Sequence, residues 1–391
     1  MNSKNSLMAG ALLLLSATPL TAQSLFSTRG LGVPMPAVDA RAAALGGIGV
    51  GLIGFHTSLT NPAELAGVTR RGVTAALQPV TTSFDVAGAE DGTAGTRFPL
   101  IGVVYPASDR IVASLGFGSF LEQSWGILTQ SSQVIGDRTY EVSDLQSSRG
   151  GIAQARVSAV YSFSPTFAVG AAAGLLTGNV TRTVVRSFVD STGILLRPFE
   201  QDLSWRYSAP IASVGMRLDV AGRVRLGASA LVGGKLKAHG TSDDADDRVY
   251  GAPLELSAGA SARLTSLVLG TIGAVWSRMP ETEGAALTQE TLRVGGGIEY
   301  QGLRFGERTF PLRLGGHWSE LPYHAAGEEA PAEWGLGGGF GFRLGDPMDP
   351  AAVADVAIER GGRSGLGSAD LEGGLEESLW RFTLSLSLFA R

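Results

Sequence analysis

The sequence predicts an all-β fold, a transmembrane antiparallel β-barrel of about 14 strands with an N-terminal hatch segment. Three observations predict it: apolar and polar residues alternate with period 2 over most of the chain, the alternating segments are even in number, and the tryptophans gather at one end of them. The composition agrees, because 55 of the 391 residues are glycine and only 17% are charged. After the N-terminus, no apolar run reaches the ~18–20 residues that a membrane-spanning helix needs.

The first residues have the pattern of a secretory signal peptide. Lys4 supplies a positive charge, residues 7–17 form a short apolar core, and Ala22 is a small residue at the expected cleavage point. The core is too short for an anchor helix, and the absence of cysteine excludes a lipoprotein. We therefore expect residues 1–22 to be removed on export, with the cell outer membrane as the destination.

Residues 23–70 differ from the rest of the chain. Residues 38–44 favour a short helix, residues 46–54 are rich in glycine, and Asn61-Pro62-Ala63 has the composition of a turn. A ring of about 14 strands encloses a lumen wider than its own side chains can fill. The sequence therefore predicts that residues 23–70 form a hatch, or plug, inside a barrel made by residues 71–391.

Alternating segments of about ten residues follow from Val73 onward. In the last of them, Trp380, Phe382 and Leu384 alternate with polar residues, while Phe389 lies out of phase with this apolar set. The segments begin near Val73, Phe98, Ile111, Ile152, Thr166, Leu203, Arg223, Pro253, Ser266, Thr291, Arg308, Pro331, Ala352 and Leu379.

The connections between these segments alternate between long and short. The long ones include residues 85–97, 122–150 and 178–202, which we expect to be external loops. The short ones are expected to be periplasmic turns, which places both ends of the barrel in the periplasm.

The aromatic residues favour a barrel over a two-sheet sandwich. Rings with a polar edge prefer the two membrane interfaces, whereas a sandwich gives no reason for tryptophans to gather at one end. All six tryptophans fall at predicted external strand ends: Trp125, Trp205, Trp276, Trp318, Trp334 and Trp380.

Residues 41–50 (RAAALGGIGV) and 60–66 (TNPAELA) resemble the start of the FadL-type long-chain fatty-acid and hydrophobic-compound transporter superfamily, and are similar to its PorV/PorQ-like relatives. The shared features are a Gly-Gly-rich segment and an Asn-Pro-Ala element just before the first strand. The resemblance implies a barrel of roughly fourteen strands with an N-terminal hatch folded into the lumen. The candidate ligand or hatch residues are Arg41, Gly46, Gly47, Asn61, Pro62 and Ala63.

The Asn61-Pro62-Ala63 element predicts a rigid turn. Asparagine can bond its own backbone two residues on, and proline fixes the next φ. Two interpretations stay open: the turn is a structural clasp for the hatch, or it is the pivot about which the hatch moves.

Ionisable residues lie on the inward phase of the predicted strands, among them Arg293 and Arg313. Charges facing lipid would be costly, so their phase supports the register. These arginines are candidate residues of the lumen, and two interpretations stay open. They steer a carboxylate ligand, because the parallel N–H donors of a guanidinium suit a carboxylate, or they pair with interior acids and the hatch.

Phe120, Leu121, Trp125, Ile127 and Leu128 lie where the third predicted strand passes into an external loop. Exposed apolar surface marks binding, so these residues are candidates for capture of a hydrophobic solute. The alternative is an extended strand with its tryptophan in the interface girdle. Two nearby strand glycines, Gly116 and Gly118, would permit a kink that opens the wall sideways, as the resemblance suggests.

Several functional classes are excluded. The chain has no cysteine, so it has neither disulfides nor thiol chemistry. Its four histidines, at positions 56, 239, 317 and 324, lack metal-ligand spacing, and no Ser-His-Asp set stands out. The sequence therefore predicts no metal, no cofactor and no enzyme activity. A net charge of −5 without a basic cluster argues against nucleic-acid binding.

The predicted function is passive uptake of hydrophobic small molecules, fatty-acid-like in kind, across the outer membrane. The expected partners are the lipid bilayer, a hydrophobic ligand and the barrel assembly machinery. The alternative is a PorV-like docking or anchoring component of a protein secretion system, with a secretion component as its partner.

Overall fold

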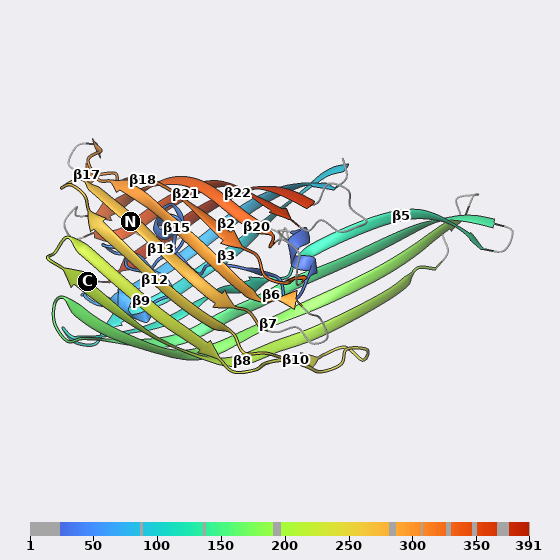
Figure 1. Ribbon diagram of the computed structural model, residues 1–391, viewed down its shortest axis with the longest axis horizontal. Helices are drawn as coiled ribbons and strands as arrows, with labels where there is room; N and C mark the ends of the chain where they lie inside the picture. Colours follow the sequence, from blue (N-terminus) through green and yellow to red (C-terminus); the bar gives the residue numbers. More distant parts are fainter. Residues whose placement is uncertain are drawn as a thin grey trace, which may run out of the picture.

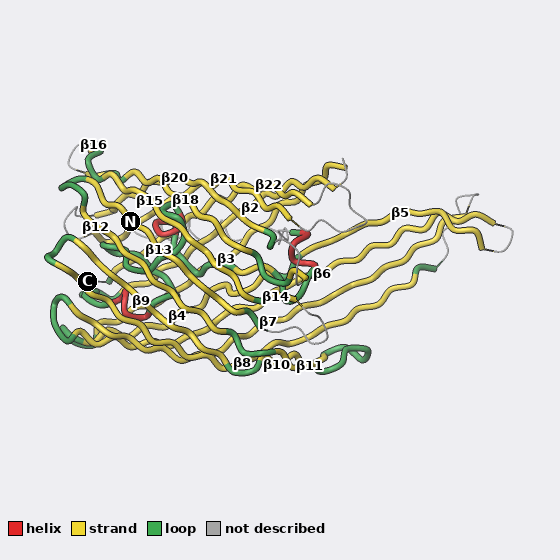
Figure 2. The backbone as a smooth tube through the Cα atoms, in the orientation of Figure 1, coloured by secondary structure: helices red, strands yellow, loops and turns green. Residues whose placement is uncertain are grey.

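The computed structural model describes residues 24–86, 89–135, 138–190, 197–280, 287–305, 308–325, 330–345, 350–365 and 375–390. The predicted signal peptide lies outside these ranges. Most of the described chain is strand (Figure 2). Its helices are short, namely the 3-10 helices η1 (Leu25–Thr28) and η2 (Pro62–Leu65) and the α-helix α2 (Ala40–Ala43). None of these described helices has the length and apolar character needed to cross a bilayer.

Within the described residues, fourteen strands close an antiparallel ring, in which the last strand, β22, returns to the first, β2 (Figure 1). This confirms the predicted fold class and strand number. In ring order the strands are β2 (Gly72–Val86), β3 (Ala89–Pro106), β4 (Ile111–Glu122), β6 (Arg138–Ser162), β7 (Phe167–Asp190), β8 (Phe199–Val220), β9 (Val224–Gly233), β12 (Leu254–Arg263), β13 (Val268–Arg278), β15 (Glu290–Tyr300), β18 (Leu312–Glu320), β20 (Ala332–Gly345), β21 (Pro350–Gly365) and β22 (Leu375–Phe389).

Eight further strands are described outside the ring. They are β1 (Val33–Pro34), β5 (Trp125–Ile135), β10 (Leu236–Gly240), β11 (Arg248–Tyr250), β14 (Leu287–Thr288), β16 (Arg304–Phe305), β17 (Arg308–Thr309) and β19 (His324–Ala325).

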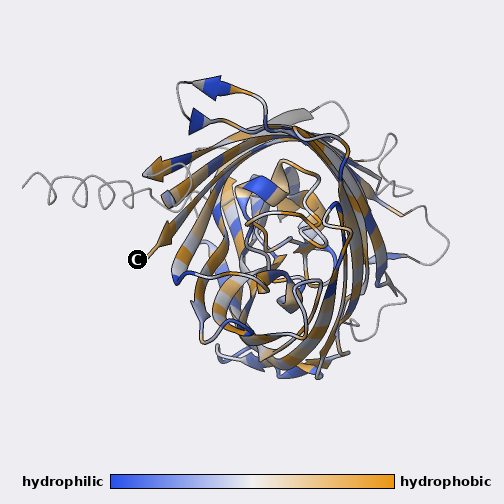
Figure 3. Ribbon diagram, turned by 90° about the vertical axis from the view of Figure 1, so that its left-hand side faces the viewer, coloured by the Kyte–Doolittle hydropathy of each residue, from blue (hydrophilic) through white to orange (hydrophobic). Residues whose placement is uncertain are grey.

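The two faces of the wall differ in polarity. Trp380, Phe382 and Leu384 of β22 point outward and are 43%, 46% and 47% exposed, whereas Thr383 and Ser385 between them are buried inside the ring. Apolar residues outside and polar residues inside are the arrangement of a barrel that contacts lipid. Figure 3 shows the same alternation of apolar and polar positions around the ring.

Phe389 lies out of phase because it serves a different contact. Its ring packs edge-on against Phe55 of the N-terminal segment, with 5.0 Å between the ring centroids. The β22 register is continuous up to this residue, which lies opposite Gly72 of β2. The end of the last strand thus faces the interior of the barrel.

The predicted external loops 85–97, 122–150 and 178–202 are instead mostly strand where the structure describes them. β5, residues 138–150 of β6, residues 179–190 of β7 and residues 199–206 of β8 extend beyond the rest of the ring as a four-stranded arm, at the right of Figure 1. The apolar alternation ends where the strands leave the bilayer, but valine, threonine and phenylalanine still favour extended backbone there. The prediction of loops was wrong for this reason.

The arm defines one end of the barrel, the arm end. At the opposite end, the turn end, tight connections at residues 107–110, 163–166 and 221–223 join the strands. Tight turns face the periplasm in outer-membrane barrels, so the arm points away from it.

The predicted tryptophan girdle is correct for four of the six residues. Trp276, Trp318, Trp334 and Trp380 lie on outward-facing positions, and Trp318 stands directly opposite Trp334 in the β18–β20 pair. Trp125 and Trp205 are instead buried, with 8% and 4% of their surface exposed. Trp205 packs into an apolar cluster inside the barrel, so apolar contact rather than the interface determines its place.

Residues 24–71, the N-terminal segment, run through the interior of the ring from the arm end to the turn end (Figure 3). At the arm end, Ser24 Oγ donates to Glu377 Oε2 near the start of β22 (2.8 Å). At the turn end, Arg70 donates to the carbonyl of Pro350 at the start of β21 (2.8 Å). The predicted helix within residues 38–44 is present as α2.

Candidate functional site

The Asn61-Pro62-Ala63 turn is enclosed by wall strands. Asn61 caps η2: its side-chain oxygen accepts from Ala63 N (2.9 Å), and its amide donates to Glu64 Oε1 (3.1 Å) and to Met216 O of β8 (3.1 Å). Pro62 occupies the first helical position, where a missing N–H leaves no partner unsatisfied. The turn is rigid, and one of its bonds joins the N-terminal segment to the wall.

Glycines of the wall make room for this segment. A Cβ atom at Gly215 of β8 would lie 2.0 Å from Asn61 Oδ1, and one at Gly259 of β12 would lie 2.2 Å from Val50 O. Any larger residue would push the segment away, since a strand glycine permits close approach of another backbone. Part of the high glycine content is therefore explained by contact with the N-terminal segment.

Replacing Asn61 with alanine is expected to lower the free energy of unfolding by ~1–3 kcal/mol, because the η2 cap and the bond to Met216 O are lost together. The ring should still assemble, since no ladder hydrogen bond changes. Urea unfolding in detergent and protease protection of the N-terminal segment measure this. Ser108→Ala removes a comparable but exposed cap at the turn end and is the control. Unchanged stability with blocked passage would identify the turn as a pivot rather than a clasp.

Arg41 of α2 belongs to a buried chain of charges. Its Nε donates to Glu299 Oε2 of β15 (2.8 Å). Glu299 also accepts from Arg313 Nε of β18 (2.8 Å), and Arg313 donates to Asp355 Oδ1 of β21 (2.6 Å). Buried ions are stable only when paired, so this chain fixes α2 to three wall strands. Arg313 is engaged by interior acids on both sides.

Gly46 and Gly47 follow α2 with φ values of +94° and +71°. This left-handed conformation ends a helix and favours glycine. A Cβ at Gly46 would also lie 2.5 Å from Gly296 N of β15, and one at Gly47 would lie 2.8 Å from the Arg293 guanidinium. Both glycines thus shape the path of the backbone along the wall.

The arm end of the N-terminal segment is held by a second ionic cluster. Leu25 N donates to Glu377 Oε1 (2.6 Å), and Arg363 donates to both Ser24 Oγ (2.8 Å) and Glu377 Oε2 (3.1 Å). Arg363 also pairs with Glu333 of β20 (2.6 Å). The segment is therefore fixed at its start, at α2 and at η2.

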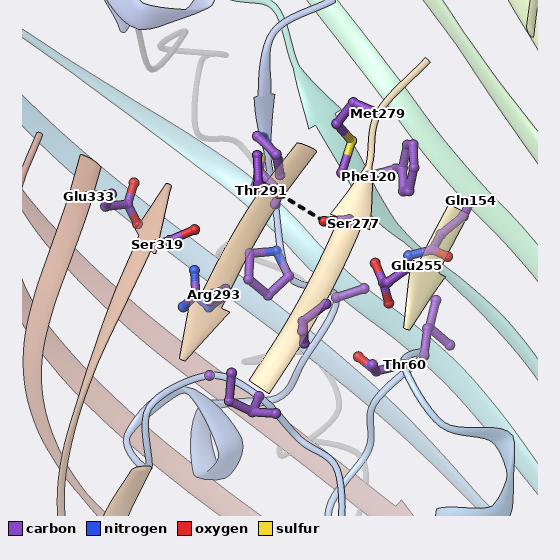
Figure 4. A pocket seen from close by; sticks show the side chains of 18 of the residues that line it. Thr60, Phe120, Gln154, Glu255, Ser277, Met279, Thr291, Arg293, Ser319 and Glu333 are labelled. Carbon is purple, nitrogen blue, oxygen red and sulfur yellow. Dashed lines mark hydrogen bonds between the residues drawn. The ribbon is translucent and has the colours of Figure 1, made fainter. Parts of the chain in front are cut away.

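A chamber of about 80 Å³ lies between the N-terminal segment and the wall (Figure 4). In Figure 4, Phe120 and Met279 lie together at one end, and Arg293 lies on the side opposite Glu255. The apolar lining residues are Pro34, Met35, Pro36, Ala37, Ile48, Leu59, Phe120, Val275, Met279 and Leu321, and the polar ones include Gln154, Arg156, Glu255, Ser277, Thr291, Arg293, Ser319 and Glu333.

Three lining residues of this chamber carry unsatisfied buried atoms. Arg156 Nε, Gln154 Oε1 and Arg293 Nε have no hydrogen-bond partner among the described residues. Buried polar atoms are nearly always paired, so these atoms indicate a place for a polar group. Together with the apolar lining, they suit a small molecule with an apolar body and a polar head. Arg293 belongs to this chamber, whereas Arg313 does not.

The predicted capture residues do not form one surface. Phe120, Leu121 and Trp125 are buried, at 7%, 2% and 8% exposure, whereas Ile127 and Leu128 of β5 are 40% and 60% exposed. The expectation of an exposed apolar loop was wrong because this part of the chain continues as strand. The first two residues instead join an apolar cluster that fills the lumen at the arm end.

Tyr323 completes that apolar cluster. It has a φ of +68°, and its ring lies against Gly30, where a Cβ would come within 2.3 Å of the ring. Its hydroxyl donates to Pro280 O (3.2 Å), and burial raises the pKa of the phenol well above its usual value. Tyr323 therefore closes the arm end of the lumen as a neutral side chain.

The wall has a seam between β3 and β4. The two strands pair from Leu100 opposite Gly118 to Pro106 opposite Val112, whereas residues 89–97 of β3 pair with β2 alone and residues 98 and 99 pair with neither strand. Pro99 lies where the pairing stops, and a proline cannot donate to the ladder. We call the gap between residues 89–99 of β3 and 119–122 of β4 the seam.

The N-terminal segment covers the β4 side of the seam. Strand β1 pairs with β4, with Val33 opposite Glu122 and Pro34 opposite Leu121. Across the seam, Arg97 Nε of β3 donates to Glu122 Oε1 (3.0 Å). The wall is therefore bridged here by side chains rather than by its own backbone ladder, and β1 extends its β4 side.

The predicted kink at Gly116 and Gly118 is not the origin of the seam. β4 runs through both glycines, and its register with β6 shifts later, between Ser119 and Leu121. A Cβ at Gly116 would lie 2.4 Å from the Leu59 side chain. These glycines therefore accommodate the N-terminal segment. The two strands separate at Pro99 of β3 and at the register shift of β4 between Ser119 and Leu121.

A second cavity of about 40 Å³ connects these features. It lies beside Pro34, Met35 and Pro36, shares Arg293 with the chamber, and reaches Arg97 at the seam. Residues 34–36 of the N-terminal segment line both cavities and thus separate the chamber from the seam. At the turn end, a wider cavity of about 440 Å³ is lined by residues that include Arg70, Arg217, Arg225, Arg343 and Phe55.

Comparisons with known proteins agree with this architecture. A family model described as BamG matches residues 4–204. None of the curated proteins matches the chain. The crystal structure of a Pseudomonas aeruginosa FadL homologue is similar, with a TM-score of 0.57, 13% identity, and coverage of 91% of this chain and 99% of that chain.

Two toluene transporters have the same fold. TbuX of Ralstonia pickettii has a TM-score of 0.55 at 14% identity, over 90% of this chain and 98% of its own. TodX of Pseudomonas putida has a TM-score of 0.53 at 14% identity, over 95% of this chain and 99% of its own. At these identities the likeness establishes a FadL-type fold.

Proposed function

We propose, from the fact that this chain belongs to the BamG family and has a FadL-type barrel fold, that it is an outer-membrane channel for passive uptake of small hydrophobic molecules. The central chamber carries the proposal, because it combines an apolar lining with unsatisfied polar atoms and lies beside the seam. Two proteins of the same fold are toluene transporters, which supports this class of solute.

The N-terminal segment is the hatch of this channel in our proposal. A solute enters past the apolar cluster at the arm end, reaches the chamber, and leaves through the seam when residues 34–36 move aside. The chamber volume of about 80 Å³ holds only a few water molecules, so a larger solute requires this movement. The seam is the weakest part of the wall because backbone pairing is missing there.

A bulky residue in the chamber tests the proposal directly. Ser277 of β13 lines the chamber, and Ser277→Trp is expected to reduce toluene uptake into proteoliposomes at least tenfold by filling it. Ala274→Trp on the outward face of the same strand is the matched control and should transport normally. Equal uptake by both variants, at equal amounts of assembled barrel, would refute passage through the chamber.

The chamber also favours a solute with an acidic head, such as a fatty acid. Arg156 and Arg293 both line it, and a guanidinium recognises a carboxylate well. Arg293→Gln is expected to lower the uptake of a long-chain fatty acid roughly tenfold while toluene uptake stays unchanged, since a charged hydrogen bond contributes ~1.5–3 kcal/mol. Arg278→Gln, at an exposed pair, is the control. An equal loss for both solutes would exclude recognition of the head group.

A second candidate is a docking component of a secretion system. The arm and the buried bonds of the N-terminal segment to the wall favour it, because a fixed segment suits an anchor better than a gate. Wild-type uptake no faster than in vesicles without the protein would favour this role.

A further inference from the structure

The arm has an open strand edge along β5. One edge of β5 pairs with β6, from Trp125 opposite Ser148 to Ile135 opposite Arg138. No other described strand pairs with β5, so its second edge presents backbone donors and acceptors that are outside any ladder. An open edge of 11 residues is a template for strand addition.

This edge lacks the features that normally prevent strand addition. Its sequence, WGILTQSSQVI, contains neither a charged residue nor a proline. The opposite edge of the arm, residues 199–204 of β8, carries Glu200 and Asp202, and Thr241 N covers it by donating to Ser204 O (2.8 Å). Natural proteins protect open edges with charge, proline or a covering loop. One edge of the arm is thus protected and the other is not.

The chain itself already adds a strand to the neighbouring part of this edge. β4 and β5 both pair with β6, with Glu122 opposite Gly151 and Trp125 opposite Ser148, so they are consecutive parts of one edge. Strand β1 occupies the β4 part, where Met35 N donates to Phe120 O (2.9 Å). The β5 part continues this edge beyond Val33, the first residue of β1, which lies opposite Glu122.

We propose that the free edge of β5 binds an extended segment of a partner polypeptide, outside the membrane at the arm end, as an added β-strand. The segment is expected to be weakly charged, with apolar residues on the face that carries Leu128 and Val134, which are 60% and 73% exposed. These two residues share a face because strand side chains alternate.

A second copy of the chain fits this edge poorly. Two copies in one membrane have the same orientation, so a two-fold axis along the membrane normal relates them. The two β5 strands would then point in the same direction along the membrane normal but tilt to opposite sides of it. Their backbones would cross at one point instead of forming a ladder of hydrogen bonds. A free segment of a different polypeptide has no such restriction.

Photo-crosslinking in intact cells tests the register of this interaction. Two variants carry a crosslinking amino acid, one at Gln130 and one at Ser132. Both are expected to capture the same segment of the same protein, and the two crosslinked residues of that segment should be two positions apart. Such spacing is specific to a paired strand. Capture of this same chain, capture of unrelated peptides at the two positions, or no capture at all would each overturn the proposal. Gln201 on the protected edge is the control position.

A charged variant gives the second test. Ser131→Lys with Gln133→Lys is expected to reduce crosslinking from Gln130 at least tenfold, because lysine on an edge opposes strand addition. Phe199→Lys with Gln201→Lys adds the same charge to the β8 edge and should leave the adduct unchanged. Heat-modifiability on gels confirms that both barrels have assembled. Equal crosslinking in both double variants would overturn the proposal.

Discussion

Oxidation of a Pro34→Cys, Leu121→Cys double variant is expected to reduce toluene uptake to the level of vesicles without the protein, and reduction is expected to restore it. The two residues are opposite each other in the β1–β4 pair. Met35 N bonds Phe120 O, so the 34–121 pair is the non-hydrogen-bonded one, with Cα atoms ~4.5 Å apart, within the range of a disulfide. The chain has no other cysteine. The crosslink would hold the N-terminal segment on the seam.

The Leu121→Cys single variant, treated with the same oxidant, controls for the lost leucine and should remain active. The Pro34→Cys single variant, oxidised in the same way, controls for the lost proline and should also remain active. If the oxidised double variant transports as fast as the reduced one, the seam is not the route of passage and the docking role gains support.

Glu299→Gln is expected to destabilise the seated N-terminal segment by ~3–5 kcal/mol, since removing one partner of a buried ion pair leaves the other charge uncompensated. Glu299 accepts from both Arg41 and Arg313, and its side chain is 2% exposed. The ladder of the ring stays intact, so the loss should appear as earlier protease cleavage of residues 24–71 and a lower urea midpoint.

Glu290→Gln provides the matched control on the same strand. Glu290 pairs with Arg278 at 2.8 Å, but both side chains are about half exposed, at 51% and 50%. Exposed pairs contribute ~0–1 kcal/mol, so this variant should resemble the wild type. Equal effects of the two substitutions would show that the Arg41–Glu299–Arg313 chain does not hold the segment in place.

The fold was predictable because each strand of a membrane barrel has lipid on one side and the lumen on the other. Apolar and polar residues must therefore alternate along it. In β22, Trp380 to Leu388 follow that rule residue by residue, and the prediction of this strand is confirmed. In the arm both faces leave the lipid, the hydropathy signal fades, and residues such as Thr183 and Val184 were assigned to a loop although they form strand.

The site was less predictable because its contacts join distant parts of the chain. Arg41 and Glu299 are 258 residues apart, so the pattern placed both in the lumen without pairing them. The seam has one local signal in the sequence, Pro99 inside a strand, because proline in a strand indicates a break in pairing. Wall glycines such as Gly215 gave no signal, because the backbone that they accommodate becomes visible only in three dimensions.

The close fit between the N-terminal segment and the wall has a consequence for biogenesis. At Gly215 and Gly259 the segment lies so close to the wall that a Cβ atom would not fit, so we expect segment and sheet to fold together. Glu377, which accepts a hydrogen bond from Ser24, belongs to β22. The same strand closes the ring by pairing with β2. We therefore expect Ser24 to be fixed in place at the same step at which β22 closes the ring.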